Sequence, residues 1–292
     1  LSAWQLHCQA ALKLGKIMAQ PELQVTIHGH VPSDFWEELE AELRDCYRRL
    51  PSDLRVVQVH LLDTVERLRE FLARERAELG IATASGEEFL ATHDAWRGVP
   101  RITICRERIE SVPPLVGLGA IRHEVAHTIL HGSLEYFVFR LSRDLVARGR
   151  ERGLDDLALQ QLLYHVAIAV KDCEAARLLV EHGYVECQVA LALYQMEIGD
   201  EDRLAWLLAR SDPRARLIYL AAQLKPLLFA QPLRRLTAFS RPLEERARAM
   251  LAFLPAEERE GLTTLAERVA SSLGDDTRQN IEMALWSVLT LL

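Results

Sequence analysis

The chain has 292 residues, of which 49% are hydrophobic, 26% charged and 7% aromatic, and its formal net charge is −7. These values are typical of a soluble globular protein and exclude a disordered, collagen-like or coiled-coil chain. No apolar run approaches the roughly 20 residues that a membrane span requires, so we expect no membrane partner.

The first 20 residues mix Gln, His and Lys with apolar residues and are predicted to form an amphipathic helix. They lack the unbroken apolar core and the small-residue cleavage site of a signal peptide. The five cysteines form no CxxC pair, which argues against a disulfide framework and against a thiolate zinc site. We therefore expect a cytoplasmic protein.

Short strands and helices alternate in the first third of the chain. Alternating polarity and β-branched residues predict the strands, and apolar residues three or four positions apart predict the helices. The predicted elements, in chain order, are a strand at 24–29, a helix at 35–50, a strand at 55–61, a helix at 64–79 ending at Gly80, a strand within 88–93 and a strand at 101–105.

Helical spacing dominates from Pro113 to the end of the chain, interrupted only by Gly and Pro residues. The sequence therefore predicts an α+β fold, with a small N-terminal β-sheet and its helices followed by a mostly α-helical C-terminal part. We place the border near Gly199, which gives two domains, 1–199 and 200–292.

The segment from Pro114 to Gly132 is predicted to form one helix, with Pro114 in its first turn and Gly132 as the left-handed residue past its end. His123 and His127 are four residues apart, so they lie about 40° apart around the helix and about 6 Å apart along it. Both imidazoles can then reach one metal ion. His131 lies too far along the axis to be a third ligand and is predicted to support the site or the helix end.

Glu124 lies about 100° around the helix from His123, where it can contact a water rather than the metal. This is the geometry of an HExxH zinc hydrolase, in which the metal acidifies the water and the Glu accepts its proton. The spacing therefore predicts His123 and His127 as zinc ligands and Glu124 as the general base.

The stretch Arg122–His131 resembles the HExxHxLLH helix of the gluzincin metallopeptidases, especially the ImmA/IrrE type. The resemblance implies a zincin-like fold for residues 1–199, a Zn²⁺ cofactor and a peptide or protein substrate. It also implies a third ligand from a later helix, where the matching segment is Lys171–Leu179. In that segment Asp172 takes the ligand position, with Asp in place of the family's Glu.

Glu174 is the alternative third ligand. Asp172 and Glu174 are about 200° apart on a helix and cannot both face one ion. Arg177 follows Glu174 by three residues and is predicted to pair with it. Asp172 has apolar neighbours, and a carboxylate in such surroundings needs a compensating cation. The spacing therefore favours Asp172.

Other residues are candidates for contact with the substrate. Tyr164 and His165, on the same predicted helix as Asp172, are candidate substrate or transition-state groups, and Arg177, His182 and Tyr184 are weaker ones. His93, Asp94 and Trp96 are candidates for the wall of the cleft. The edge of the strand at 101–105 is expected to hydrogen-bond an extended peptide.

The sequence is compatible with two further classes of function. A non-catalytic zincin-fold protein, acting as a binding or regulatory domain, is the alternative to a peptidase. Ten basic and three acidic residues lie between Arg203 and Arg248. Because no stacking pattern of aromatic residues accompanies them, we expect a solvated helix face rather than a nucleic-acid partner.

Overall fold

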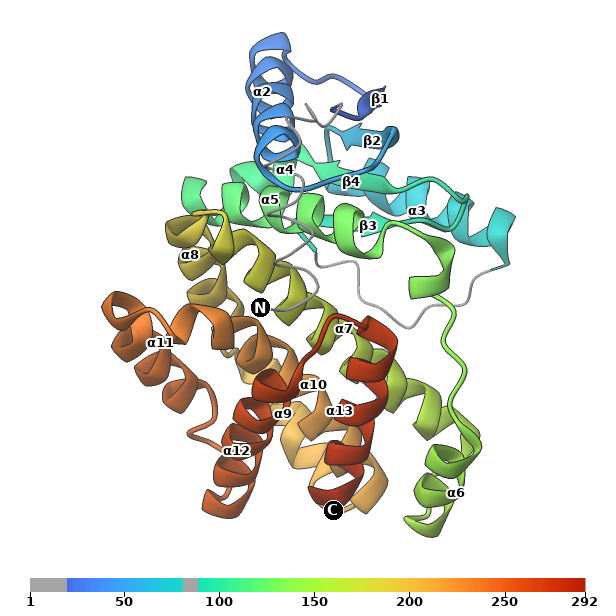
Figure 1. The fold of residues 1–292 in the computed structure, drawn as a ribbon, viewed down its shortest axis with the longest axis vertical. Helices are drawn as coiled ribbons and strands as arrows, with labels where there is room; N and C mark the ends of the chain where they lie inside the picture. The colour runs from blue at the N-terminus through green and yellow to red at the C-terminus, as the bar shows by residue number, and fades with distance from the viewer. Residues whose placement is uncertain (1–19, 81–88, 292) are drawn as a thin grey trace. The chain divides into compact units, whose positions relative to one another are not determined.

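The computed structural model describes residues 20–80 and 89–291 (Figure 1), and these divide into two compact units, one up to residue 138 and one from residue 139 on. The α+β fold is confirmed. The amphipathic helix predicted over the first 20 residues lies outside the described part. Among the described helices, none combines the length and the apolar character needed to cross a bilayer.

The first unit contains a mixed four-stranded sheet in the order β1-β2-β4-β3. Pairs β1–β2 and β2–β4 are parallel, and β3–β4 is antiparallel. The strands are β1 (Glu22–His28), β2 (Val56–Leu62), β3 (Ala91–Asp94) and β4 (Arg101–Cys105). All four predicted strands are therefore present. The edge prediction is wrong, because β2 and β3 pair with β4 on its two sides and β3 ends the sheet.

The helices of the first unit are α2 (Ser33–Arg49), α3 (Val65–Leu79), α4 (Arg106–Glu110) and α5 (Pro114–His131), followed by a 3₁₀ turn at Leu134–Tyr136. Thr64 caps α3 by accepting a hydrogen bond from the backbone N–H of Arg67, and the left-handed Gly80 ends it. These are the start and stop that the sequence predicts.

Helix α3 covers one face of the sheet. The rings of His28 and His60 lie 5.1 and 4.9 Å from the ring of Phe71 in α3. Leu62 and Cys105 join Phe71 in one buried cluster. Because side chains alternate along a strand, the neighbours of these residues point to the other face.

Helix α5 packs against β3 and β4 on that other face and also contacts α2. In β3, His93 pairs with Ile102 and points toward α5, whereas Asp94 pairs with Arg101 and points toward α3. Neighbouring residues of one short strand therefore serve opposite faces of the sheet.

Gly132 does not adopt the left-handed conformation that we expected. Its φ is −77° and its ψ is 21°. A Cβ at this position would overlap the carbonyl oxygen of Thr128 and lie 3.0 Å from the Cβ of Pro100. Glycine is needed here because a side chain would collide with Thr128 and Pro100. The helix does end at the predicted position, but the reason is this close packing and not a left-handed backbone.

The second unit is all-helical. Its helices are α6 (Arg143–Glu151), α7 (Asp156–Glu181), α8 (Val185–Gln195), α9 (Asp200–Ala209), α10 (Pro213–Arg234), α11 (Thr237–Met250), α12 (Ala256–Ser272) and α13 (Thr277–Leu291). Helix α7 packs against α8, α10 and α13. The division after Val138 falls earlier than the border that we placed near Gly199, since α7 belongs with the helices that follow it.

Candidate metal centre

Helix α5 brings His123 and His127 together, as the sequence predicts. Their Nε2 atoms are 3.0 Å apart, and the side chains are 3% and 2% exposed. Two Zn–N bonds of about 2.0–2.1 Å at a tetrahedral angle place the nitrogens roughly 3.3 Å apart. The pair therefore needs only a small opening to hold one zinc ion. Val125, on the opposite face of the helix, and Ala126 are fully buried and hold the helix in the core.

His131 lies behind His127 rather than beside the pair. Its Nδ1 is 3.0 Å from the Nδ1 of His127, and the residue is fully buried. A neutral imidazole has one N–H, so donation from His127 Nδ1 to His131 leaves the Nε2 of His127 free of its proton. Histidines that bind metals are commonly oriented in this way through their other nitrogen.

Glu124 is held by a residue from β3. The Nδ1 of His93 lies 2.7 Å from Oε2 of Glu124, and the two side chains are 11% and 12% exposed. The His93 ring also stacks on His127, with centroids 4.1 Å apart and planes 10° apart. We predicted His93 only as a wall of the cleft. The alternation of side chains along β3 could have predicted which face of the sheet His93 points to. Its contact with Glu124 could not be predicted, because it depends on how β3 pairs with β4.

The donor set suits zinc, which binds imidazole nitrogen and carboxylate oxygen. Besides the His123–His127 pair, one ligand atom from each of His93, Glu124 and His127 lies within 4.8 Å of the other two. All these residues come from β3 and α5. The first unit thus concentrates four possible metal-binding or proton-accepting side chains at one place.

Asp172 and Glu174 lie on α7 in the second unit, and their surroundings differ. Asp172 is 6% exposed, and its Oδ2 is 3.7 Å from Nζ of Lys225 in α10. This ammonium group compensates the buried carboxylate, where we expected a metal ion to do so. Its assignment as the third zinc ligand stays a prediction.

Glu174 is engaged by α13 through both carboxylate oxygens. Asn280 donates to Oε1 at 2.6 Å, and the hydroxyl of Thr277 donates to Oε2 at 2.8 Å. Arg177, which we expected to pair with Glu174, donates to the carbonyl oxygens of Leu273 and Gly274. These bonds give Glu174 a structural role and weaken its case as a ligand.

Tyr164 and His165 also lie on α7, with ring centroids 5.3 Å apart. Tyr164 is 44% exposed. Burial and the positive charge of Lys225 lower the pKa of His165. A role for either residue toward a substrate stays a prediction.

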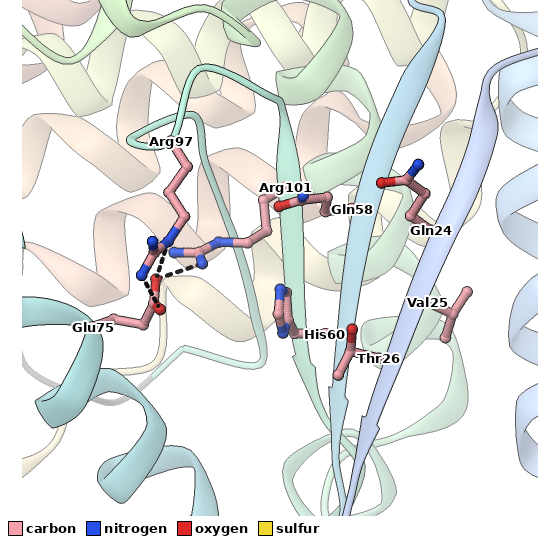
Figure 2. A pocket seen from close by; sticks show the side chains of 8 residues that line it. All are labelled: Gln24, Val25, Thr26, Gln58, His60, Glu75, Arg97 and Arg101. Atoms are coloured by element: carbon pink, nitrogen blue, oxygen red, sulfur yellow. Dashed lines mark hydrogen bonds and ion pairs between the residues drawn. The ribbon is translucent and has the colours of Figure 1, made fainter. Parts of the chain in front are cut away.

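A polar cavity of about 350 Å³ lies on the α3 face of the sheet, where no motif predicted a site. Its lining residues are Gln24, Val25, Thr26, Gln58, His60, Glu75, Arg97 and Arg101. Figure 2 shows the carboxylate of Glu75 between the guanidinium groups of Arg97 and Arg101. Burial raises the pKa of Glu75, but hydrogen bonds from the two arginines outweigh it and bring this pKa to about 2.

No protein-family model matches the chain, and neither a curated protein nor a solved structure matches it.

Proposed function

We propose that the protein is a zinc-dependent metallopeptidase, similar in its HExxH helix to the gluzincins of the ImmA/IrrE type. The observation that carries this proposal is the 3.0 Å separation between the Nε2 atoms of His123 and His127, with Glu124 beside them on the same buried helix. Imidazoles at this spacing and an adjacent carboxylate are the residues that metal-assisted hydrolysis requires.

In this proposal His123, His127 and Asp172 hold Zn²⁺, and Glu174 is the alternative third ligand. When bound, Zn²⁺ would supply Lewis acidity toward a carbonyl oxygen and would lower the pKa of a water molecule. Glu124 accepts a proton from that water and passes it to the departing amine. The Nδ1 of His93 orients the Glu124 carboxylate, and His131 orients the ring of His127.

The proposed substrate is an extended peptide. Within the described residues β3 is the last strand of the sheet, and it carries His93. An extended peptide can hydrogen-bond to an exposed strand edge, which gives affinity without requiring a particular sequence. Tyr164 and His165 are the proposed substrate-side or transition-state groups, and we propose a cytoplasmic location.

The test is Glu124→Gln, measured by metal analysis and by cleavage of an unfolded protein substrate. We expect the bound zinc to be retained and hydrolysis to fall by about 10²–10⁴-fold, the typical contribution of a general base. Glu110→Gln, at a carboxylate that is 52% exposed on α4, is the matched control and should change neither quantity.

Unchanged hydrolysis in Glu124→Gln would contradict the proposal. A wild-type protein that binds zinc but cleaves none of a broad set of peptides would instead favour the alternative, a non-catalytic zincin-fold protein with a binding or regulatory role.

A further inference from the structure

The side chains around His127 offer more ligands than one zinc position uses. His123 and His127 form one pair, with nitrogens 3.0 Å apart. His93, Glu124 and His127 form a second group, whose ligand atoms lie within 4.8 Å of one another. The two groups share His127, and the second one includes the proposed general base.

The second group is built from rigid elements. His93 is on β3, which is paired along its length with β4, and the other two residues are on α5, which packs against both strands. Three ligands at zinc distances lie roughly 3.3 Å apart, so the group would contract by about 1.5 Å at most. Its carboxylate and imidazole are 2.7 Å apart and would separate slightly, and the His93 ring would rotate out of its stack on His127 so that both imidazole lone pairs point at one ion.

One nitrogen of His127 limits how many ions can bind. Its Nδ1 contacts Nδ1 of His131 and its Nε2 contacts Nε2 of His123, so the same Nε2 would bind a cation in either group. A single lone pair serves one cation at a time. Occupation of the two positions is therefore mutually exclusive.

We propose that the protein has a second divalent-cation position, formed by His93, Glu124 and His127, which alternates with the position at His123 and His127. In the second position Glu124 is a ligand and cannot accept a proton from water. This consequence rests on the proposed peptidase activity, whereas the cation position itself does not. Movement of the ion between the two positions would switch the enzyme between an active and a resting form.

The test uses Zn²⁺ alone and the variant His123→Asn, which removes only the first position. Equilibrium dialysis should show that this variant still binds one zinc ion per chain. Adding His93→Gln should then weaken binding at least tenfold, because a ligand of the second position is lost. In the wild-type background His93→Gln should change affinity less than threefold, since the first position remains. His30→Gln, at an exposed histidine, is the matched control for both backgrounds.

Two results would overturn the proposal: loss of zinc from folded His123→Asn, or equal affinity in His123→Asn with and without His93→Gln. If His123→Asn does not fold, crystals of the wild-type protein are prepared with one equivalent of zinc and with excess zinc. Anomalous maps at the zinc edge then show which residues contact the ion. A peak contacting His93 and Glu124 supports the second position, and peaks only at His123 and His127 contradict it. The peptidase proposal is tested separately, since Glu124→Gln is judged by hydrolysis.

Discussion

The carboxylate of Glu75 shows how strongly one buried ion pair affects the first unit. It accepts hydrogen bonds from Arg97 and from Arg101, whose side chain is only 5% exposed. Removing one partner of a buried pair leaves the other charge poorly compensated, which costs more than the pair contributes.

Glu75→Gln should therefore lower the free energy of unfolding by about 3 kcal/mol at pH 7. The pKa of Glu75 falls from 4.5 to about 2 on folding, so the stabilisation is complete above pH 4.5 and is lost as the pH falls toward 2. Urea unfolding of both proteins from pH 7 to pH 2.5 measures this. Their stability difference should shrink below pH 4.5.

Glu78→Gln is the control for Glu75, because Glu78 also pairs with Arg97 but is 62% exposed. An exposed pair contributes little, so we expect a change below about 1 kcal/mol. Equal effects of the two substitutions would show that the buried arginine does not depend on Glu75.

Gly132 is the second residue for which we predict the effect of a substitution on stability. Gly132→Ala should destabilise the protein by about 1–3 kcal/mol, because the new methyl group would overlap the carbonyl oxygen of Thr128 at the end of α5. Thermal unfolding measures this effect. Gly274→Ala is the control, since a Cβ there would lie 3.9 Å from its nearest neighbour. A neutral Gly132→Ala would mean that the helix end can shift freely.

Helices α7 and α13 are joined by the hydrogen bonds to Glu174. Asn280→Ala removes the donor 2.6 Å from its Oε1 as well as a bond to the carbonyl of Gly274. Hydrogen bonds to buried charged groups contribute about 1.5–3 kcal/mol, so we expect a loss of about 2–4 kcal/mol in urea unfolding. Gln279→Ala, at the exposed neighbouring position, should be nearly neutral.

At the level of elements, the sequence predicted what local periodicity determines. The four-residue spacing of His123 and His127 places both side chains on one face of α5 without help from tertiary contacts. Thr64 and Gly80 mark the two ends of α3. The contact between His93 and Glu124 could not be predicted, because it requires the antiparallel register of β3 on β4. The same missing information caused the error about the edge strand.

At the scale of the whole molecule, the α+β class followed from the position of the strands in the first third of the chain. The division into two units could not be predicted, because the residues around Val138 do not have the Gly-, Pro- or Ser-rich composition of a linker. Helix α7 is buried over most of its length, and helical periodicity alone does not show that α10 and α13 are among its partners.

The third zinc ligand is a question for the intact chain, since Asp172 belongs to the second unit. Asp172→Asn should lower zinc affinity at least tenfold, because the proposed site would lose an anionic ligand. Glu174→Gln should leave affinity unchanged, although it should weaken the contact with α13. Zinc titration of both variants measures this, and the reverse pattern would make Glu174 the ligand.

Strand β3 has only four residues, and its alternation directs an imidazole to one side of the sheet and a carboxylate to the other. A slip of one residue would exchange them. Asp94 would then oppose Glu124 as a like charge, and Arg101 would lose an anionic partner. The connection between β3 and β4 helps to set this register, so a single-residue deletion between Ala95 and Pro100 should destabilise the protein more than a substitution there.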